Sequence, residues 1–165
     1  MQGNISCFGT TRILVVDNHP VVRSSIRGLL ELHPDLEVGG EADGAAQTWT
    51  ALAEWTPDLV VMDLVLGKDD GLRLLTEIRG KYPDLPVLIF SMHSEFLFAE
   101  RALSAGADGF IMKGNASEYL VVAIREVLAG RVYLSHTFRE HIKWKAHARA
   151  DRERGQHKIF TAKRH

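Results

Sequence analysis

The sequence contains a single cysteine, Cys7, so no disulfide bond can form within the chain. No apolar run approaches the roughly 18 residues that a membrane span needs. The N-terminal segment, from Met1 to Thr11, also lacks the basic start and apolar stretch of a secretory signal. These absences favour a cytoplasmic protein in a reducing compartment, without a membrane partner.

Charge is distributed unevenly along the chain. Residues 1–138 have 11 Lys/Arg and 18 Asp/Glu, a net charge of −7, whereas residues 139–165 have 9 and 3, a net charge of +6. We therefore expect an acidic globular domain followed by a basic extension. Phe138 and Ile142 have helical spacing in that extension. A short basic tail is weak evidence for nucleic-acid binding, so a solvated, partly helical extension is the simpler interpretation.

Short apolar segments recur along most of the chain before this extension and alternate with stretches of helical spacing. The expected strands are Arg12–Val16, Leu36–Glu41, Leu59–Met62, Val87–Phe90 and Gly109–Met112. Three of them are continuously apolar, as strands that are buried on both faces of a parallel sheet must be. Five β–α repeats with short connections predict an α/β fold, a doubly wound parallel sheet with helices on both faces.

Between these strands, apolar residues recur at helical spacing. The predicted stripes are Val22, Ile26, Leu29 and Leu30; Leu72, Leu75 and Ile78; and Leu120, Val121, Ile124, Val127 and Leu128. Pro20 suits the first turn of the first helix. Gly80 and Gly130 follow helical patterns, where left-handed caps are expected. Asn115 and Glu118 have the spacing of a capping box.

Polar side chains follow four of the five predicted strands. Asp17 and Asn18 come after the first strand, Asp63 ends the third, Ser91 ends the fourth and Lys113 ends the fifth. In doubly wound sheets the functional crevice lies at the carboxyl ends of the strands. We therefore expect these five side chains to meet at one edge of the sheet.

This set of groups suits phosphoryl transfer. Two neighbouring carboxylates repel each other, and Mg²⁺ relieves that repulsion through its oxygen ligands. One carboxylate can then attack phosphorus and form an acyl phosphate. The metal and the ammonium neutralise the phosphoryl oxygens, and the hydroxyl donates a hydrogen bond to one of them.

Four segments resemble response-regulator receiver domains and occur in that family's order: ILVVDNHPVVR, VVMDLVLGKDDGL, VLIFSMHSE and GADGFIMKGNASEYLVVAIREVLAG. DNHPVVR, SMHSE and AGRVYLS are most similar to the NarL/FixJ type. The resemblance implies a flavodoxin-like fold with sheet order 2-1-3-4-5. It divides the chain into an N-terminal extension (1–11), a receiver domain (12–134) and a basic C-terminal extension (135–165).

The resemblance also implies roles for individual residues. Asp63 is expected to be the phosphoacceptor, Lys113 the phosphate-binding lysine, Ser91 the switch hydroxyl and Phe110 the rotating switch aromatic. His19 and His93 flank this site, and we assign them no catalytic part.

The implied Mg²⁺ ligands are Asp17, Asn18, Asp63 and the backbone carbonyl of Val65. The family usually has two acidic residues where this chain has Asp17 and Asn18. Asparagine keeps an oxygen ligand but loses a charge, so we expect weaker Mg²⁺ binding.

The expected function is signal transduction rather than enzyme catalysis. A sensor histidine kinase or a small phosphodonor would phosphorylate Asp63, and the altered surface would act on an output partner or on transcription. Slow loss of the phosphoryl group and a homodimer are compatible with this function. An aspartyl phosphatase is disfavoured, because such enzymes usually have a second aspartate where this chain has Val65.

Two alternatives stay open. Asn18 favours a receiver-fold interaction module that works without phosphorylation. The second alternative is that the chain is the N-terminal fragment of a DNA-binding regulator, since NarL/FixJ-type proteins typically continue into a helix-turn-helix domain. The segment after Phe138 is too short for such a domain, so this chain alone does not support DNA binding.

Overall fold

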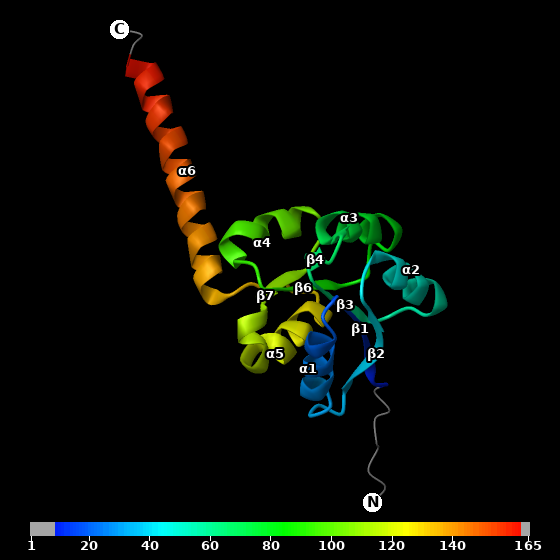
Figure 1. Ribbon diagram of the computed structural model, residues 1–165. Coiled ribbons are helices and arrows are strands. Elements are labelled where there is room, and N and C mark those ends of the chain that lie inside the picture. Colours follow the sequence, from blue (N-terminus) through cyan, green and yellow to red (C-terminus); the bar gives the residue numbers. More distant parts are fainter. Residues whose placement is uncertain (1–8, 163–165) are drawn as a thin grey trace, which may run out of the picture. The chain divides into compact units, whose positions relative to one another are not determined.

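The sheet at the centre of the protein has five parallel strands, in the order β2-β1-β3-β6-β7 (Figure 1). The computed structural model describes residues 9–162, and the side chains of residues 9–149. The strands are β1 (Thr11–Val16), β2 (Leu36–Ala42), β3 (Leu59–Met62), β6 (Val87–Ser91) and β7 (Gly109–Met112). Each predicted strand is therefore confirmed to within one residue at either end, and so is the predicted sheet order.

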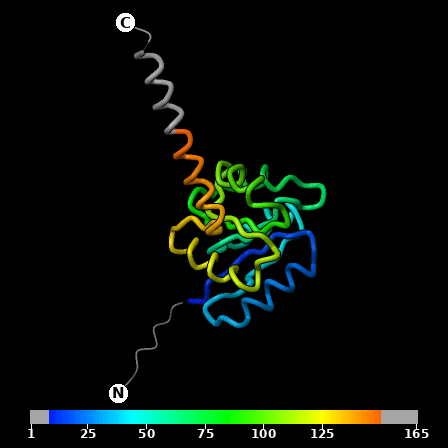
Figure 2. The backbone as a smooth tube through the Cα atoms, turned by 90° about the vertical axis from the view of Figure 1, so that its left-hand side faces the viewer, coloured from blue at the N-terminus to red at the C-terminus, as the bar shows by residue number. Residues whose placement is uncertain are grey.

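Helices cover both faces of this sheet. They are α1 (Pro20–Leu30), α2 (Ala45–Glu54), α3 (Gly71–Lys81), α4 (Glu95–Ser104) and α5 (Ala116–Leu128). Helices α1 and α5 contact each other and lie side by side on one face, drawn in blue and yellow in Figure 2. Helices α2, α3 and α4 cover the other face (Figure 1). The flavodoxin-like, doubly wound architecture predicted from the sequence is confirmed.

The core explains why the strands are apolar at every position. In β1, Ile13 and Val15 belong to the cluster that packs under α1 and α5, while Leu14 and Val16 alternate with them. All four are at most 1% exposed. Alternate residues of a strand point to opposite faces, so a sheet covered on both sides buries all of them. The sheet is consequently a rigid base for the loops at its edges.

The ends of the helices agree only in part with the predictions. Pro20 is the first residue of α1, and Gly130 follows α5 with a φ of +79°, as predicted. Gly80 is not a cap, because α3 continues through it and Tyr82 N donates to Ile78 O. The predicted capping box at Asn115 is also wrong. Asn115 ends a 3-10 turn and makes no side-chain cap, since its φ of −106° and ψ of 10° are not the extended conformation that capping requires.

A short hairpin follows β3 and was not predicted. Strands β4 (Val65–Leu66) and β5 (Asp69–Asp70) pair in antiparallel fashion around Gly67, whose φ is +64°. Glycine favours this conformation at the first central position of a two-residue turn. Asp69 Oδ2 accepts a hydrogen bond of 2.8 Å from Ala45 N at the start of α2. The hairpin is thereby attached to a helix that begins well before it in the chain.

The chain divides after Tyr133 into two compact units. The second unit contains α6 (His136–Ala162), in the extension that was expected to be partly helical. Ser135 precedes this helix, and its Oγ accepts a hydrogen bond of 3.1 Å from Phe138 N. None of the helices in the described part of the chain has the length and apolar character of a membrane span.

Replacing one core residue of α5 tests the packing of the sheet against its helices. Ile124 is fully buried in the cluster beneath α5, whereas Val122 on the same helix is half exposed. Ile124→Ala is expected to lower the free energy of unfolding by about 2–5 kcal/mol in a urea titration. The control, Val122→Ala, should change it by no more than about 0.5 kcal/mol. Equal effects of the two substitutions would contradict the described packing.

Candidate functional site

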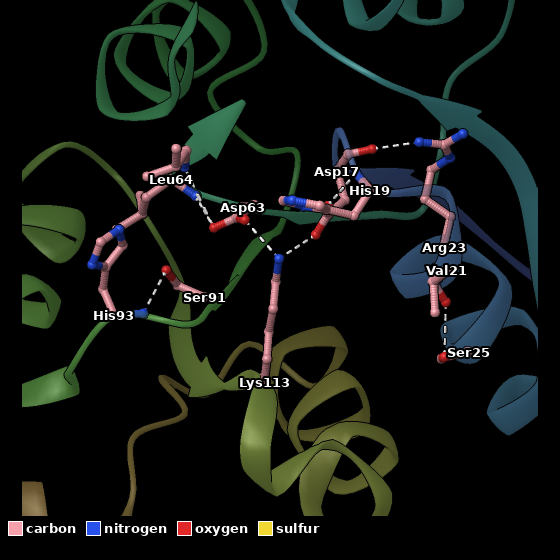
Figure 3. A network of polar contacts seen from close by, with 11 residues as sticks. Asp17, His19, Val21, Arg23, Ser25, Asp63, Leu64, Ser91, His93 and Lys113 are labelled. Atoms are coloured by element: carbon pink, nitrogen blue, oxygen red, sulfur yellow. Dashed lines mark hydrogen bonds and ion pairs between the residues drawn. The ribbon is translucent and has the colours of Figure 1, made fainter. Parts of the chain in front are cut away.

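The carboxyl ends of the central strands bring four of the predicted site residues together. Residues Val16 and Met62 pair in register at the ends of β1 and β3, so Asp17 and Asp63, the next residues, emerge side by side. Ser91 pairs with Met112 at the ends of β6 and β7, and Lys113 follows. Figure 3 shows Asp17, Asp63 and Lys113 in one cluster, with Ser91 beside it.

Lys113 lies between the two carboxylates. Its Nζ is 2.5 Å from Asp17 Oδ2 and donates a hydrogen bond of 2.6 Å to Asp63 Oδ2. All three side chains are nearly buried, the most exposed being Lys113 at 7%. One ammonium neutralises only one of two carboxylates, so the cluster keeps a net negative charge. Such an uncompensated buried charge is costly, and a cation would reduce the cost.

The Asp63 carboxylate is held in a defined orientation. Its Oδ1 accepts hydrogen bonds from Leu64 N (2.7 Å) and Val65 N (3.4 Å), while Oδ2 faces Lys113. The backbone N–H of Asp63 itself donates to Val16 O at 2.9 Å, which continues the sheet to this position. The nucleophilic group predicted from the sequence is therefore fixed by β3 and by the first residues of the following loop.

Asp17 is fixed by its neighbours in the loop before α1. Its Oδ1 accepts a hydrogen bond of 2.8 Å from His19 N and lies 3.1 Å from His19 Nδ1. Its backbone carbonyl accepts a hydrogen bond of 2.6 Å from Arg23 Nη1, and Arg23 Nε donates to Glu41 at 3.0 Å. Burial alone would raise the pKa of Glu41, but the hydrogen bonds and charges of Arg27 and Arg23 together lower it.

The oxygen atoms around the cluster fit a divalent cation. Asp17 Oδ2 and Asn18 Oδ1 are buried and make no hydrogen bond among the described residues; Asp17 Oδ2 has only the ionic contact with Lys113. Carboxylate and amide oxygens are the ligands that Mg²⁺ prefers. Val65, whose carbonyl is a further predicted ligand, follows Asp63 and Leu64 at the start of β4.

The two predicted switch residues are both buried on the strands next to Lys113. Ser91 is fully buried, and its Oγ accepts a hydrogen bond of 3.2 Å from His93 N. Phe110 is fully buried on β7, where it pairs in register with Ile89 of β6. Their part in a conformational switch stays a prediction.

A hollow of about 410 Å³ opens over the cluster. It is lined by His19, Val21, Val22, Asp63, Val65, Met92, His93 and Lys113. The walls are mainly apolar, and Val21 and Met92 are largely exposed. Asp63 and Lys113 are thus the groups at the floor of a hollow that a phosphoryl donor could enter. The contact of His19 with Asp17 was not predicted, since the sequence assigned this histidine no catalytic part and the bend at Asn18 brings the two side chains together.

Comparison with known proteins gives a consistent result. A family model of the response regulator receiver domain matches residues 13–125. The chain is 37% identical over 125 residues to the methanol utilization control regulatory protein MoxX of Paracoccus denitrificans, a match that covers 74% of this chain and 56% of MoxX. It is 36% identical over 124 residues to the response regulator GacA of Pseudomonas aeruginosa, covering 75% of this chain and 58% of GacA. The chain therefore matches less than two thirds of the length of these relatives.

Two solved structures of related sequence have the same fold. A two-component response regulator of the LuxR family from Aurantimonas sp. SI85-9A1 has a TM-score of 0.77 at 38% identity, over 84% of this chain and 99% of that one. The signal receiver domain of the putative response regulator NarL from Mycobacterium tuberculosis has a TM-score of 0.68 at 30% identity, over 74% and 98% of the two chains.

The charge balance of the cluster can be tested by removing its cation. Lys113→Met leaves two buried carboxylates facing each other, so the free energy of unfolding without divalent ions should fall by about 3–5 kcal/mol. Mg²⁺ should restore more stability to this variant than to the wild type, because it replaces the missing positive charge. Lys68→Met, at an exposed lysine, is the control and should change neither quantity. Urea titrations with and without Mg²⁺ measure both.

The network behind Asp17 has a predictable dependence on pH. The pKa of Glu41 is lowered in the folded protein by Arg27 and Arg23, so its stabilising contribution is present above the pKa of an unfolded glutamate. That contribution is lost as pH falls through the lower folded pKa. Glu41→Gln should therefore be less stable than wild type near neutral pH, and the difference should shrink as the medium becomes more acidic than the ordinary glutamate pKa. A difference that is the same at every pH would contradict this network.

Proposed function

The chain belongs to the response regulator receiver family, and we propose that it accepts a phosphoryl group on Asp63 and signals through the resulting change of its surface. The family members are signal transducers of two-component systems rather than conventional enzymes, and relatives such as GacA are response regulators by name. The observation that carries the proposal is the buried Asp17–Lys113–Asp63 cluster, of which Asp63 and Lys113 line an open hollow.

The proposed reaction needs few groups. An Asp63 carboxylate oxygen attacks the phosphorus of a phosphohistidine on a sensor histidine kinase, or of a small phosphodonor. The new O–P bond forms as the bond from phosphorus to the donor atom breaks, and the leaving group keeps the electron pair. Lys113, already hydrogen-bonded to Asp63, neutralises charge on the phosphoryl oxygens. Positioning and charge are thus supplied by residues that the fold holds in place.

Receiver domains generally use Mg²⁺ for this reaction. We propose Asp17, Asn18, Asp63 and the carbonyl of Val65 as its ligands, and the buried Asn18 Oδ1, which makes no hydrogen bond among the described residues, supports this assignment. When bound, Mg²⁺ supplies positive charge to the transferring phosphoryl group. Asn18 contributes a neutral oxygen in place of the usual carboxylate, so the affinity for Mg²⁺ is expected to be low.

The proposed switch begins at Ser91. Its Oγ, which accepts from His93 N in this structure, would donate to a phosphoryl oxygen on Asp63, and Phe110 would follow into the space nearby. The output surface is formed by α4, β7 and α5. Phe96 and Leu97 on α4 and Tyr119 and Val122 on α5 are partly or largely exposed, which suits a homodimer or another output partner.

The lifetime of the phosphorylated state depends on the side chains around Asp63. Val65 and His93 line the hollow above it, and a valine excludes an attacking water rather than orienting it. We therefore propose slow autodephosphorylation. The output includes transcription, as the names of relatives suggest, and the compartment is the cytoplasm, which is typical of response regulators.

One alternative has a specific observation in its favour. Asn18 removes a charge from the metal site, as expected of a receiver-fold module that binds partners without being phosphorylated. Phosphorylation of Asp63 separates the two functions.

We expect acetyl phosphate with Mg²⁺ to add one phosphoryl group to the protein, as measured by intact mass spectrometry. Asp63→Asn should abolish the addition, because it removes the nucleophile but keeps the shape of the side chain. Asp58→Asn is a control at an aspartate that precedes β3, at the opposite end of the strand from Asp63, and accepts a hydrogen bond from Arg12 N. This control should be labelled like the wild type. Labelling that persists in Asp63→Asn would show that the proposed phosphoacceptor is wrong, and no labelling of the wild type would favour the interaction module.

A further inference from the structure

We infer that His19 is a metal ligand at the Asp63 site, which gives this site a mixed nitrogen and oxygen donor set that prefers Mn²⁺ to Mg²⁺. The inference rests on the proposed phosphoacceptor site, since it concerns the cation bound there. Neither the family resemblance nor the proposed reaction assigns a role to this imidazole.

The imidazole of His19 lies close to both carboxylates of the site. Ligand atoms of Asp17, His19 and Asp63 all lie within 4.8 Å of one another. His19 Nδ1 lies 3.1 Å from Asp17 Oδ1, and Figure 3 shows the His19 side chain beside Asp17 and Asp63.

The His19 side chain has one polar neighbour among the described residues, the Asp17 carboxylate. His19 is the N-cap residue of α1, yet its side chain makes no capping hydrogen bond. The imidazole is 63% exposed, and its Nδ1 lies 3.1 Å from Asp17 Oδ1. Two ligand atoms bound to one octahedral cation lie about 3 Å apart, so Nδ1 and Oδ1 fit neighbouring positions on one ion.

Asn18 Oδ1 is an unsatisfied oxygen next to His19. It is buried without a hydrogen bond among the described residues, and buried polar atoms are rarely left in this state. Asp17 Oδ2 is also buried, but it already contacts Lys113 Nζ at 2.5 Å. A cation bound by Asn18 Oδ1, by the Asp17 carboxylate and by His19 would satisfy the amide oxygen and balance the remaining negative charge of the cluster.

The ligand set decides which cation is preferred. Mg²⁺ is a hard ion that takes oxygen ligands, and it gains little from an imidazole. First-row transition ions accept imidazole nitrogen, and their affinities rise along the series from Mn²⁺ to Cu²⁺. The site has one negative charge fewer because Asn18 is neutral. His19 adds a nitrogen donor that strengthens Mn²⁺ binding but contributes little to Mg²⁺ binding. Removal of the imidazole should therefore lower the affinity for Mn²⁺ more than the affinity for Mg²⁺.

The test uses the full chain with Mn²⁺ as the probe. Pulsed electron paramagnetic resonance should detect a ¹⁴N modulation from a directly bound imidazole in the wild type and not in His19→Gln. Calorimetric titration should show that His19→Gln weakens Mn²⁺ binding by about tenfold or more, while Mg²⁺ binding changes by less than about threefold. His33→Gln is the matched control, because His33 lies in the connection between α1 and β2, away from the carboxyl ends of the strands; both measurements should match the wild type.

Three results would overturn the inference. The first is Mn²⁺ bound to the wild type without a nitrogen signal, and the second is a nitrogen signal that persists in His19→Gln. The third is an equal loss of Mn²⁺ and Mg²⁺ affinity in that variant. Labelling with acetyl phosphate separates this inference from the proposed function. Labelled wild type without a nitrogen signal rejects only the role of His19, whereas a nitrogen signal without labelling supports the metal ligand and rejects the phosphoacceptor.

Discussion

The contact of Lys113 with two buried carboxylates is the interaction on which the rest of the site depends. Asp17 and Asp63 follow adjacent parallel strands, so their carboxylates lie side by side and their negative charges repel each other. The ammonium of Lys113, placed there by β7, lies within 2.6 Å of both. It links three strands electrostatically and still leaves one charge unbalanced. The same arrangement leaves a net negative charge at the site, and this charge is what the proposed cation would balance.

Much of the fold follows from the sequence because it depends on local patterns. Strands buried on both faces must be continuously apolar, so segments such as Leu59–Met62 are recognisable without tertiary information. The gathering of Asp17, Asp63 and Lys113 follows in turn from the geometry of parallel strands. Asp70 illustrates the same point at smaller scale, since its side chain caps α3 through Leu72 N and Arg73 N. These features can be predicted from the order of the residues and from the fact that helices cover both faces of the sheet.

Other features depend on distant parts of the chain and could not be read locally. Gly80 and Gly130 occupy similar sequence contexts, yet one lies inside a helix and the other ends one. The strands β4 and β5 have two residues each, too few for a periodic pattern. The orientation of His19 toward Asp17 depends on the path of the chain between β1 and α1. The role of Lys113 as a bridge depends on the register of β7 against β6.

The hydrogen bond from Ala45 N to Asp69 makes one helix dependent on a loop to which it does not belong. Gly44 precedes that helix and offers no side chain for capping, and a Cβ at this position would meet Asp69 Oδ2 at 2.7 Å. The first turn of α2 is therefore stabilised from outside, by the hairpin that begins shortly after Asp63. Any displacement of that hairpin removes the cap and allows the start of α2 to fray. A displacement of the hairpin beside Asp63 would therefore reach α2, which packs on the β2 edge of the sheet, opposite the edge formed by β7.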